Sequence, residues 1–452
     1  MVLAAAVIGA ALSASAAEPR RIFDETPAQR DERMSWWRHD RFGMFIHFGL
    51  YAVPARGEWV KSVKRLSEED YDRYFRVFNP DRFDARRWVA AAKRAGMKYM
   101  VLTAKHHDGF CLFDSRLTDY KITNTKFGRD LVKEYVDACH EAGMKVGFYY
   151  SLPDWHHPEY PIDRYHPRRP VPCGPWDREG MEGPEEPWNE LNRTRRMEKY
   201  REYLHGQVRE LLTNYGKIDV MWFDFTVDGP RTKSPDDWQS ERLIRTVREL
   251  QPGIVVNDRL GLGETTWDGW DFMTPEQHLP TPETSTRHGR PADFEMCYTF
   301  SGEWGYHRDS TTWKSPKQCI ALLVKAVSCG GNLLMNVGPT ARGEFDCRAM
   351  ERLEDYGKWM DDNSDAIYGC TRPPEGFVAP EGTALTYNPS TGRLYVHILD
   401  YPSERLACAF ADRVEFARFL SDASEIPVQH GAFILPRIKP PTPVPVIEVL
   451  LR

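Results

Sequence analysis

A single aspartate stands where a buried strand is expected to end. Residues Lys217–Phe225 form an apolar run, and Asp224 comes near its carboxyl end, two residues after Trp222. Side chains alternate along a strand, so Trp222 and Asp224 share one face. A carboxylate beside an indole is costly to bury unless it is paired or used chemically. Asp224 is therefore interpreted as a nucleophile or base, with helix capping or pairing to Arg259 as the structural alternative.

Three histidines fall at the ends of other expected strands. His47 ends one strand, and His106 and His107 follow another, just before a turn at Gly109. Imidazoles in such places can hydrogen-bond to a polyhydroxylated ligand or bind a metal ion. Adjacent strand residues point in opposite directions, and the chain carries no HExxH signature, so ligand binding is favoured. The alternative, a metal-dependent hydrolase built on these histidines, would lose its activity in a chelator.

Two glutamates are candidates for a proton donor. Glu276 lies in an expected loop (MTPEQ), and Glu295 lies inside an expected strand (FEMCYTF). A general acid must reach the leaving oxygen and must hold its proton near the working pH. The loop position favours reach and the strand position favours burial, so both residues stay candidates. Glu58 and Trp59 repeat the pairing of a carboxylate with an indole. Glu58 could form an exposed ion pair in the loop, or the two residues could contact a ligand.

A repeating pattern of strands and helices carries these side chains. Seven apolar strands are expected, at Phe42–Phe48, Lys98–Lys105, Lys145–Ser151, Lys217–Phe225, Gly253–Arg259, Phe294–Phe300 and Asn332–Val337. Amphipathic helices separate them, and those at residues 84–95 and 130–142 each stop before a glycine. This rhythm is typical of a TIM barrel or of a doubly wound sheet. Polar residues gather at the carboxyl ends of the strands, and no GxGxxG or GxxxxGK[ST] follows any strand, which favours the barrel.

The chain is thus expected to have an α/β fold in two parts. Residues 18–360 are expected to form the (β/α)8-like TIM barrel. Residues 365–452 are expected to form a small antiparallel β-sandwich, because a hairpin pattern occupies residues 383–399 and another strand-like run ends the chain. A long insert, residues 156–192, follows the third strand and could cap the barrel mouth.

The start of the chain and its charge indicate where the protein works. Residues 1–17 are apolar or small and resemble a signal peptide, so a secreted or periplasmic protein is expected. No other apolar run approaches eighteen residues, so no membrane span is expected. A net charge of -6 without a basic stripe argues against nucleic acid as a partner. The nine cysteines have no zinc spacing and predict no disulfide framework.

Several motifs, in the same order along the chain, resemble those of the glycoside hydrolase family 29 α-L-fucosidases. They are FGMFIHFGLYAVPARGEW, YMVLTAKHHDGFCLFDS, GFYYSLPDWHHPEY, VMWFD, VVNDR, TPEQ, FEMCYTFSGEWGY and GGNLLMNVGPTARGEF, and they span about residues 36–360. The resemblance implies an exo-acting retaining enzyme that releases terminal α-L-fucose from glycans. Asp224 would form the covalent fucosyl intermediate, and Glu276, preferred over Glu295, would be the acid and base.

The resemblance also implies a set of fucose contacts, with no cofactor and no metal. These contacts are His47, Glu58, Trp59, His106, His107, Tyr149 or Tyr150, Trp222 and Arg259. The chain departs from the family pattern at Phe48, where tryptophan is usual, and at Phe225, where glycine commonly follows the nucleophile. Phe225 puts a large side chain beside Asp224, so the leaving-group preference could differ. The alternative is a catalytically weak fucose-binding protein on the same fold. The sequence leaves open which fucosyl linkage is preferred and whether the protein self-associates.

Overall fold

The computed structural model describes residues 19–452 except 172–173, 177–182, 228, 230, 264, 281–285 and 288–289. The expected signal peptide, residues 1–17, lies outside the described residues. Within the described part of the chain, no helix combines the length and the apolar character that a bilayer crossing requires.

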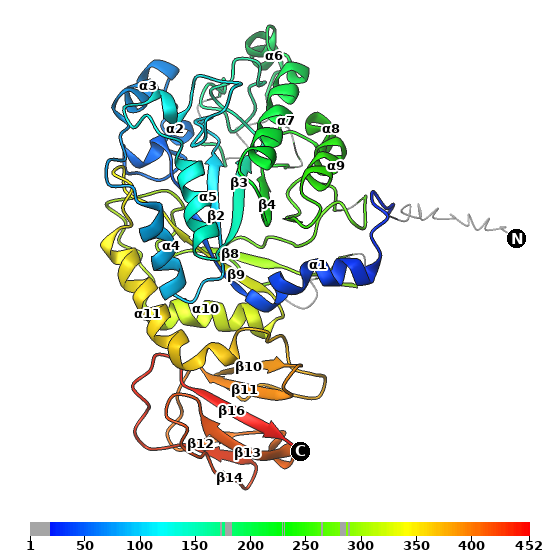
Figure 1. Ribbon diagram of the computed structural model, residues 1–452, viewed down its shortest axis with the longest axis vertical. Helices are drawn as coiled ribbons and strands as arrows, with labels where there is room; N and C mark the ends of the chain where they lie inside the picture. The colour runs from blue at the N-terminus through cyan, green and yellow to red at the C-terminus, as the bar shows by residue number, and fades with distance from the viewer. Residues whose placement is uncertain are drawn as a thin grey trace, which may run out of the picture.

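A curled parallel sheet forms the centre of the larger part of the molecule (Figure 1). The strand order is β5-β4-β3-β2-β1-β9-β8. The bounds are β1 (Phe42–Ile46), β2 (Tyr99–Lys105), β3 (Lys145–Ser151), β4 (Val220–Asp224), β5 (Val255–Val256), β8 (Glu295–Thr299) and β9 (Asn332–Val337). Single parallel bridges from Phe272, Met273 and Glu276 join the β5 side to the β8 side. The expected TIM-like barrel is confirmed, with an irregular segment between β5 and β8.

Strand β5 is much shorter than the expected Gly253–Arg259, and Asn257 gives the reason. Its side-chain amide donates to the carbonyl of Phe223 and accepts from the N–H of the same residue, both at 2.8 Å. An amide side chain thus takes the place of the next backbone pair beside β4. The chain is then free to turn, which brings Asp258 and Arg259 out of the strand direction.

Helices surround the sheet (Figure 1). They are α1 (Pro27–Asp40), α2 (Val60–Val63), α3 (Glu68–Val77), α4 (Ala85–Arg94), α5 (Leu131–Glu141), α6 (Glu186–Asn192), α7 (Met197–Thr213), α8 (Pro235–Trp238), α9 (Ser240–Leu250), α10 (Pro316–Ser328) and α11 (Cys347–Asn363). Helix α5 confirms the signals in its sequence: the Asp130 carboxylate accepts from the Lys133 N–H at 3.0 Å, and Gly143 follows the helix at φ 66°. 

Alternation along the strands separates two cores. One face of the sheet packs against the helices, and the other fills the barrel with Phe45, Tyr99, Tyr149, Trp222 and their neighbours. Tyr99 lies low in the barrel, where a Cβ on Gly43 would come within 2.4 Å of its ring. A glycine is therefore needed at that position, and the aromatic rings above it close the floor of the barrel.

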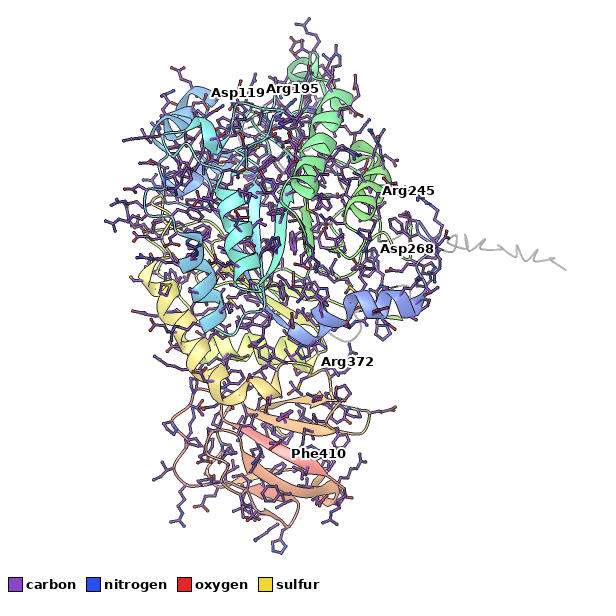
Figure 2. All side chains as sticks on the ribbon, in the orientation of Figure 1. Asp119, Arg195, Arg245, Asp268, Arg372 and Phe410 are labelled. Atoms are coloured by element: carbon purple, nitrogen blue, oxygen red, sulfur yellow. The ribbon has the colours of Figure 1, made fainter. Side chains whose placement is uncertain are left out.

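The C-terminal region contains two antiparallel sheets. The first has the order β10-β11-β16-β13, from β10 (Thr383–Asn388), β11 (Arg393–Ile398), β13 (Val414–Phe419) and β16 (Val446–Leu451). The second has the order β12-β15-β14, from β12 (Arg405–Ala407), β14 (Val428–Gln429) and β15 (Ala432–Ile434). Outside the C-terminal region, strands β6 (Thr286–Arg287) and β7 (Arg290–Pro291) form a separate short pair that precedes β8 in the chain. Phe410 lies among the C-terminal strands in a core that draws on both larger sheets (Figure 2), as expected for a sandwich.

Candidate active site

A cavity of about 1110 Å³ opens at the carboxyl ends of the barrel strands. Its inner lining includes Phe45, His47, Glu58, Trp59, His106, His107, Tyr149, Trp222, Asp224, Arg259, Glu276, Cys297 and Trp304. Parallel strands bring their carboxyl ends to one edge of the sheet, which is why residues from such distant parts of the chain meet there. None of the lining residues lies beyond residue 304, so the C-terminal sheets do not contribute to the described cavity.

Asp224 is held at the cavity by three neighbours. The Tyr149 hydroxyl donates to Oδ2 at 2.7 Å, and Arg259 Nη1 donates to Oδ1 at 2.7 Å. His107 Nε2 lies 3.9 Å from Oδ2. The side chain is nearly buried, and the guanidinium with the phenol compensates the cost of keeping a carboxylate there. The arrangement presents a fixed carboxylate to the cavity.

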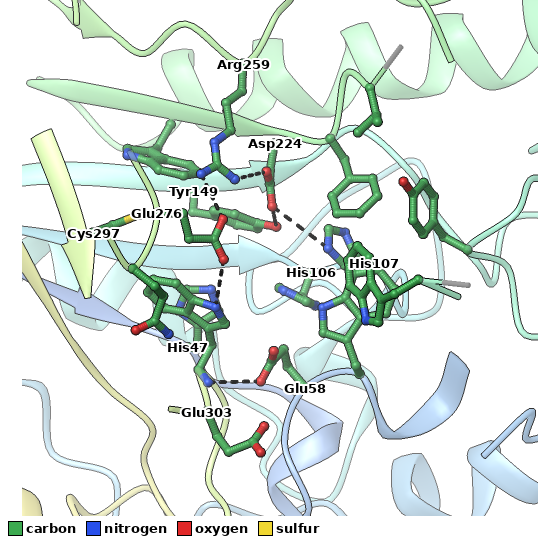
Figure 3. A pocket seen from close by; sticks show the side chains of 18 of the residues that line it. His47, Glu58, His106, His107, Tyr149, Asp224, Arg259, Glu276, Cys297 and Glu303 are labelled. Atoms are coloured by element: carbon green, nitrogen blue, oxygen red, sulfur yellow. Dashed lines mark hydrogen bonds and ion pairs between the residues drawn. The ribbon is translucent and has the colours of Figure 1, made fainter. Parts of the chain in front are cut away.

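Arg259 joins this carboxylate to a second one. Its Nη2 donates to Glu276 Oε2 at 2.9 Å, while Trp304 Nε1 donates to Glu276 Oε1 at 3.2 Å. Figure 3 shows Asp224, Arg259 and Glu276 facing one another. The guanidinium also lies over the Trp222 ring, 4.6 Å from its centroid. One cation therefore fixes two carboxylates side by side at the cavity, which is the pair that acid and base chemistry requires.

Glu58 is a third carboxyl group in the cavity, with different surroundings. Its Oε2 accepts from the backbone N–H groups of Trp304 at 3.2 Å and Gly305 at 2.7 Å. Burial raises the pKa of Glu58 to about 7, although the Gly305 N–H opposes the rise. Near neutral pH this carboxyl group can donate a hydrogen bond as well as accept one. Such a group can form hydrogen bonds with a hydroxyl group of a ligand.

The three cavity histidines are neutral at ordinary pH. Burial lowers the pKa of His47 and of His107 to about 3, and it lowers the pKa of His106 well below the usual value. Asn336 and Ser151 bond to the Nδ1 atoms of His47 and His107, each at 2.7 Å, which leaves Nε2 for a ligand. Among the described residues, the group with metal-ligand spacing is instead Glu68, Asp72 and His156. The geometry thus favours hydrogen bonding over the metal alternative for the cavity histidines.

The sequence model of a family described as Alpha-L-fucosidase matches residues 10–365. The chain belongs to the α-L-fucosidase family. The family consists of glycoside hydrolases, so the resemblance identified from the motifs is confirmed.

Solved structures and curated relatives agree with this assignment. The α-L-fucosidase isoenzyme 1 from Paenibacillus thiaminolyticus is 43% identical with a TM-score of 0.83, covering 94% of this chain and 99% of that one. The Bacteroides thetaiotaomicron fucosidase, solved as a trapped covalent intermediate, is 29% identical with a TM-score of 0.77, covering 96% and 98%. The plasma α-L-fucosidase of Homo sapiens is 29% identical over 84% of this chain and 79% of its own.

The structure gathers most of the residues that the family resemblance picked out. Asp224, Glu276, His47, Glu58, Trp59, His106, His107, Tyr149, Trp222 and Arg259 all line the cavity. Phe48, a departure from the fucosidase pattern, does not: it packs in the helix-facing core against Phe78 and Trp88. This departure from the family pattern therefore lies in the core rather than at the cavity.

Two predicted site residues lie elsewhere. Tyr150 follows Tyr149 on β3, so it points to the opposite face, where its hydroxyl bonds to Gln207 of α7 at 2.8 Å. Glu295 begins β8 and therefore lies at the lower end of the barrel, where the Tyr99 hydroxyl and Trp222 Nε1 bond to it. Neither residue lines the cavity. As positions for fucose contact and for proton transfer, these two predictions do not fit the structure.

Glu295 nevertheless has a property that can be measured. Burial raises its pKa from 4.5 to about 7, so the folded protein keeps a proton that the unfolded chain releases. The free energy of unfolding should then fall as the pH rises from about 4.5 to about 7. In Glu295→Gln, the amide can donate to Tyr99 and accept from Trp222, like the protonated acid. We expect this variant to keep kcat/KM on an aryl fucoside within a few fold and to lose less thermal stability across that pH range. A collapse of activity would show that Glu295 serves catalysis.

Several cavity residues escaped the sequence interpretation. Trp304 is the most connected of them: it donates to Glu276, its backbone contacts Glu58, and its ring lies 5.1 Å from that of His47. The Glu303-Trp304 pair repeats the Glu58-Trp59 pattern, so the same signal could have indicated it. Arg164, Tyr165 and Trp176 come from the 156–192 insert, whose described part reaches the cavity as expected of a cap.

Proposed function

We propose that the protein is an exo-acting, retaining α-L-fucosidase with Asp224 as nucleophile and Glu276 as acid and base. The observation that supports this most is the shared guanidinium of Arg259, which contacts both carboxylates at the cavity. Because both carboxylates contact the same guanidinium, a short distance between them is favoured. Retaining enzymes have their two carboxyl groups about 5–5.5 Å apart, whereas inverting enzymes have them about 6.5–9.5 Å apart. The exo action in this proposal rests on the membership of the α-L-fucosidase family.

The reaction would proceed in two displacements. Asp224 attacks C1 of the bound fucose while Glu276 gives its proton to the departing glycosidic oxygen, so that a fucosyl ester forms as the glycosidic bond breaks. Glu276 then takes a proton from water, and the water oxygen attacks C1 and releases Asp224. Arg259 and Tyr149 stabilise the charge of Asp224 before attack and after release. The relative from Bacteroides thetaiotaomicron, solved as a covalent intermediate, supports this course by similarity.

Neutral side chains would bind the hydroxyl groups of fucose. His47, His106 and His107 offer uncharged nitrogen atoms, and Glu58 can donate or accept near neutral pH. Hydrogen-bonding groups that sit already fixed in a buried cavity lose little freedom when the sugar binds. A fucosylated glycan is therefore the substrate class that this proposal names.

The anomer released first tests the proposal. In NMR spectra taken during hydrolysis of an aryl α-L-fucoside, we expect α-L-fucose to appear before mutarotation produces the β anomer. Incubation with 2-fluoro-fucosyl fluoride should attach one fluorofucosyl group to the peptide that contains Asp224, as detected by mass spectrometry. Initial release of β-L-fucose would rule out retention. Binding of fucose with no hydrolysis would favour the fucose-binding alternative.

A further inference from the structure

The three histidines of the cavity differ in what holds their rings. His47 and His107 each bond through Nδ1 to a buried side chain at 2.7 Å, His47 to Asn336 and His107 to Ser151. His106 differs, because its Nδ1 is buried and has no hydrogen-bond partner among the described residues. All three rings line the cavity (Figure 3). In a neutral imidazole, the partner of one nitrogen determines which of the two nitrogen atoms carries the hydrogen atom.

Ser151 can only accept a hydrogen bond from His107. A serine hydroxyl has one hydrogen atom, and Ser151 donates it to the carbonyl oxygen of Pro153 at 2.6 Å. The contact with His107 at 2.7 Å is therefore a donation from Nδ1–H to the serine oxygen. A neutral imidazole has one N–H group, so Nε2 of His107 is left bare. This bare nitrogen lies 3.9 Å from Asp224 Oδ2.

Asn336 has the same effect on His47. Its amide nitrogen donates to the carbonyl oxygen of Trp304 at 2.7 Å, and that oxygen can only accept, so the orientation of the amide is fixed. The amide oxygen is then the atom that faces His47, and it accepts from Nδ1–H at 2.7 Å. Nε2 of His47 is thus a second bare nitrogen atom.

A bare nitrogen atom requires a donor from the ligand. A sugar hydroxyl can donate to it, whereas a fluorine atom or an ether oxygen cannot. In a buried site with little water, two acceptors that face each other stay unsatisfied, which is costly. The bare Nε2 of His107 also leaves the Asp224 carboxylate to its two donors, Tyr149 and Arg259. An Nε2–H group there could bond to the carboxylate that attacks C1 and weaken it as a nucleophile.

We propose that Ser151 and Asn336 are positioning residues that hold His107 and His47 as hydrogen-bond acceptors for hydroxyl groups of the sugar. The inference rests on the proposed fucosidase function and adds the direction of these hydrogen bonds: the sugar donates and the two histidines accept. Neither positioning residue lines the cavity itself, so each acts through its histidine. The cavity therefore discriminates against sugars in which these hydroxyl groups are replaced by groups that cannot donate.

NMR of protein labelled with ¹⁵N in its histidine rings tests the tautomers directly, because protonated and bare imidazole nitrogen atoms have different chemical shifts. Each signal is assigned by replacing that histidine with glutamine. In the wild type, we expect the hydrogen atom on Nδ1 of both His47 and His107. In Ser151→Ala, Nδ1 of His107 loses its acceptor while Nε2 still faces Asp224, so the hydrogen atom should move to Nε2.

The other variants show whether each change is local. Asn336→Ala should move the hydrogen atom of His47 to Nε2, and neither alanine variant should change the tautomer of His106. Ser115→Ala is the matched control, because Ser115 is a buried serine whose hydroxyl donates to Glu210 instead of contacting a histidine. We expect this control to leave all three cavity tautomers unchanged.

Fluorinated sugars test what the tautomers do. We expect L-fucose to bind about tenfold more tightly than at least one of its monodeoxyfluoro analogues, as measured by calorimetry, because the fluorine cannot donate to a bare nitrogen. In Ser151→Ala or Asn336→Ala this ratio should shrink, since L-fucose loses an acceptor that the analogue never used. Both variants should also lower kcat/KM on an aryl α-L-fucoside about tenfold.

The outcomes separate this inference from the function on which it rests. A hydrogen atom on Nε2 of either His47 or His107 in the wild type would overturn it, as would unchanged tautomers in both alanine variants. Fluoro analogues that all bind as tightly as L-fucose would overturn it as well. If the tautomers are as expected but the wild type releases no fucose from an aryl α-L-fucoside, the fucosidase proposal fails and the positions of the hydrogen atoms stand.

Discussion

Asp224→Ala is expected to lower kcat on an aryl α-L-fucoside by about 10⁴-fold or more, the scale seen when a residue that forms a covalent intermediate is removed. No other described carboxylate can replace it, because Glu276 is held by Arg259 and Trp304, and Glu58 is held by backbone N–H groups. The Arg259 guanidinium keeps Glu276 as a partner in the variant, so the cavity should stay assembled.

Azide distinguishes loss of the nucleophile from loss of the fold. A small anion can enter the space that Asp224 leaves and attack C1 from the same side. We therefore expect azide to restore turnover of Asp224→Ala on substrates with good leaving groups and to give β-L-fucosyl azide, whose configuration is inverted. NMR of the product identifies it. Formation of the α-azide would place the nucleophile elsewhere.

Glu276→Ala is expected to show its effect mainly on substrates with poor leaving groups. A sugar alcohol departs slowly without a proton donor, so kcat/KM on fucosylated oligosaccharides should fall by about 10²–10⁴-fold. A nitrophenolate departs without help, so the covalent intermediate should form and accumulate on an aryl fucoside. Azide should then attack that intermediate and release α-L-fucosyl azide. The opposite anomers from the two variants would separate the two roles by chemistry.

Glu303 provides a matched control for this variant. Glu276 and Glu303 both line the cavity with side chains 42% exposed, but Arg259 contacts only Glu276. We expect Glu303→Ala to keep oligosaccharide activity within a few fold and to show no response to azide. If Glu303→Ala were rescued by azide and Glu276→Ala were not, the proton donor would be Glu303.

Local pattern predicted most of the elements and indicated the candidate chemistry of the site. The apolar run ending in Trp222-Phe223-Asp224 predicted both a buried strand and a carboxylate at its open end, because alternation and burial cost act over a few residues. The sequence likewise predicted that helix α5 begins after Asp130 and ends before Gly143. The motifs that span about residues 36–360 carried the fucosidase family resemblance, which the family comparison confirmed.

The tertiary structure decided which way the side chains point and where along the barrel axis they lie. Alternation says that Tyr149 and Tyr150 point apart, but the pairing of Tyr149 with Trp222 of β4 determines which one faces the barrel. Glu295 does face inward, yet its pairing with Asn332 at the start of β9 places it below the cavity. Trp304 contacts Glu58 across 246 residues of chain, and Phe225 has a φ of 84° that its sequence does not reveal. Sequence determined which side chains could act, whereas strand register and long-range packing, which depend on residues far apart in the chain, decided which of them meet.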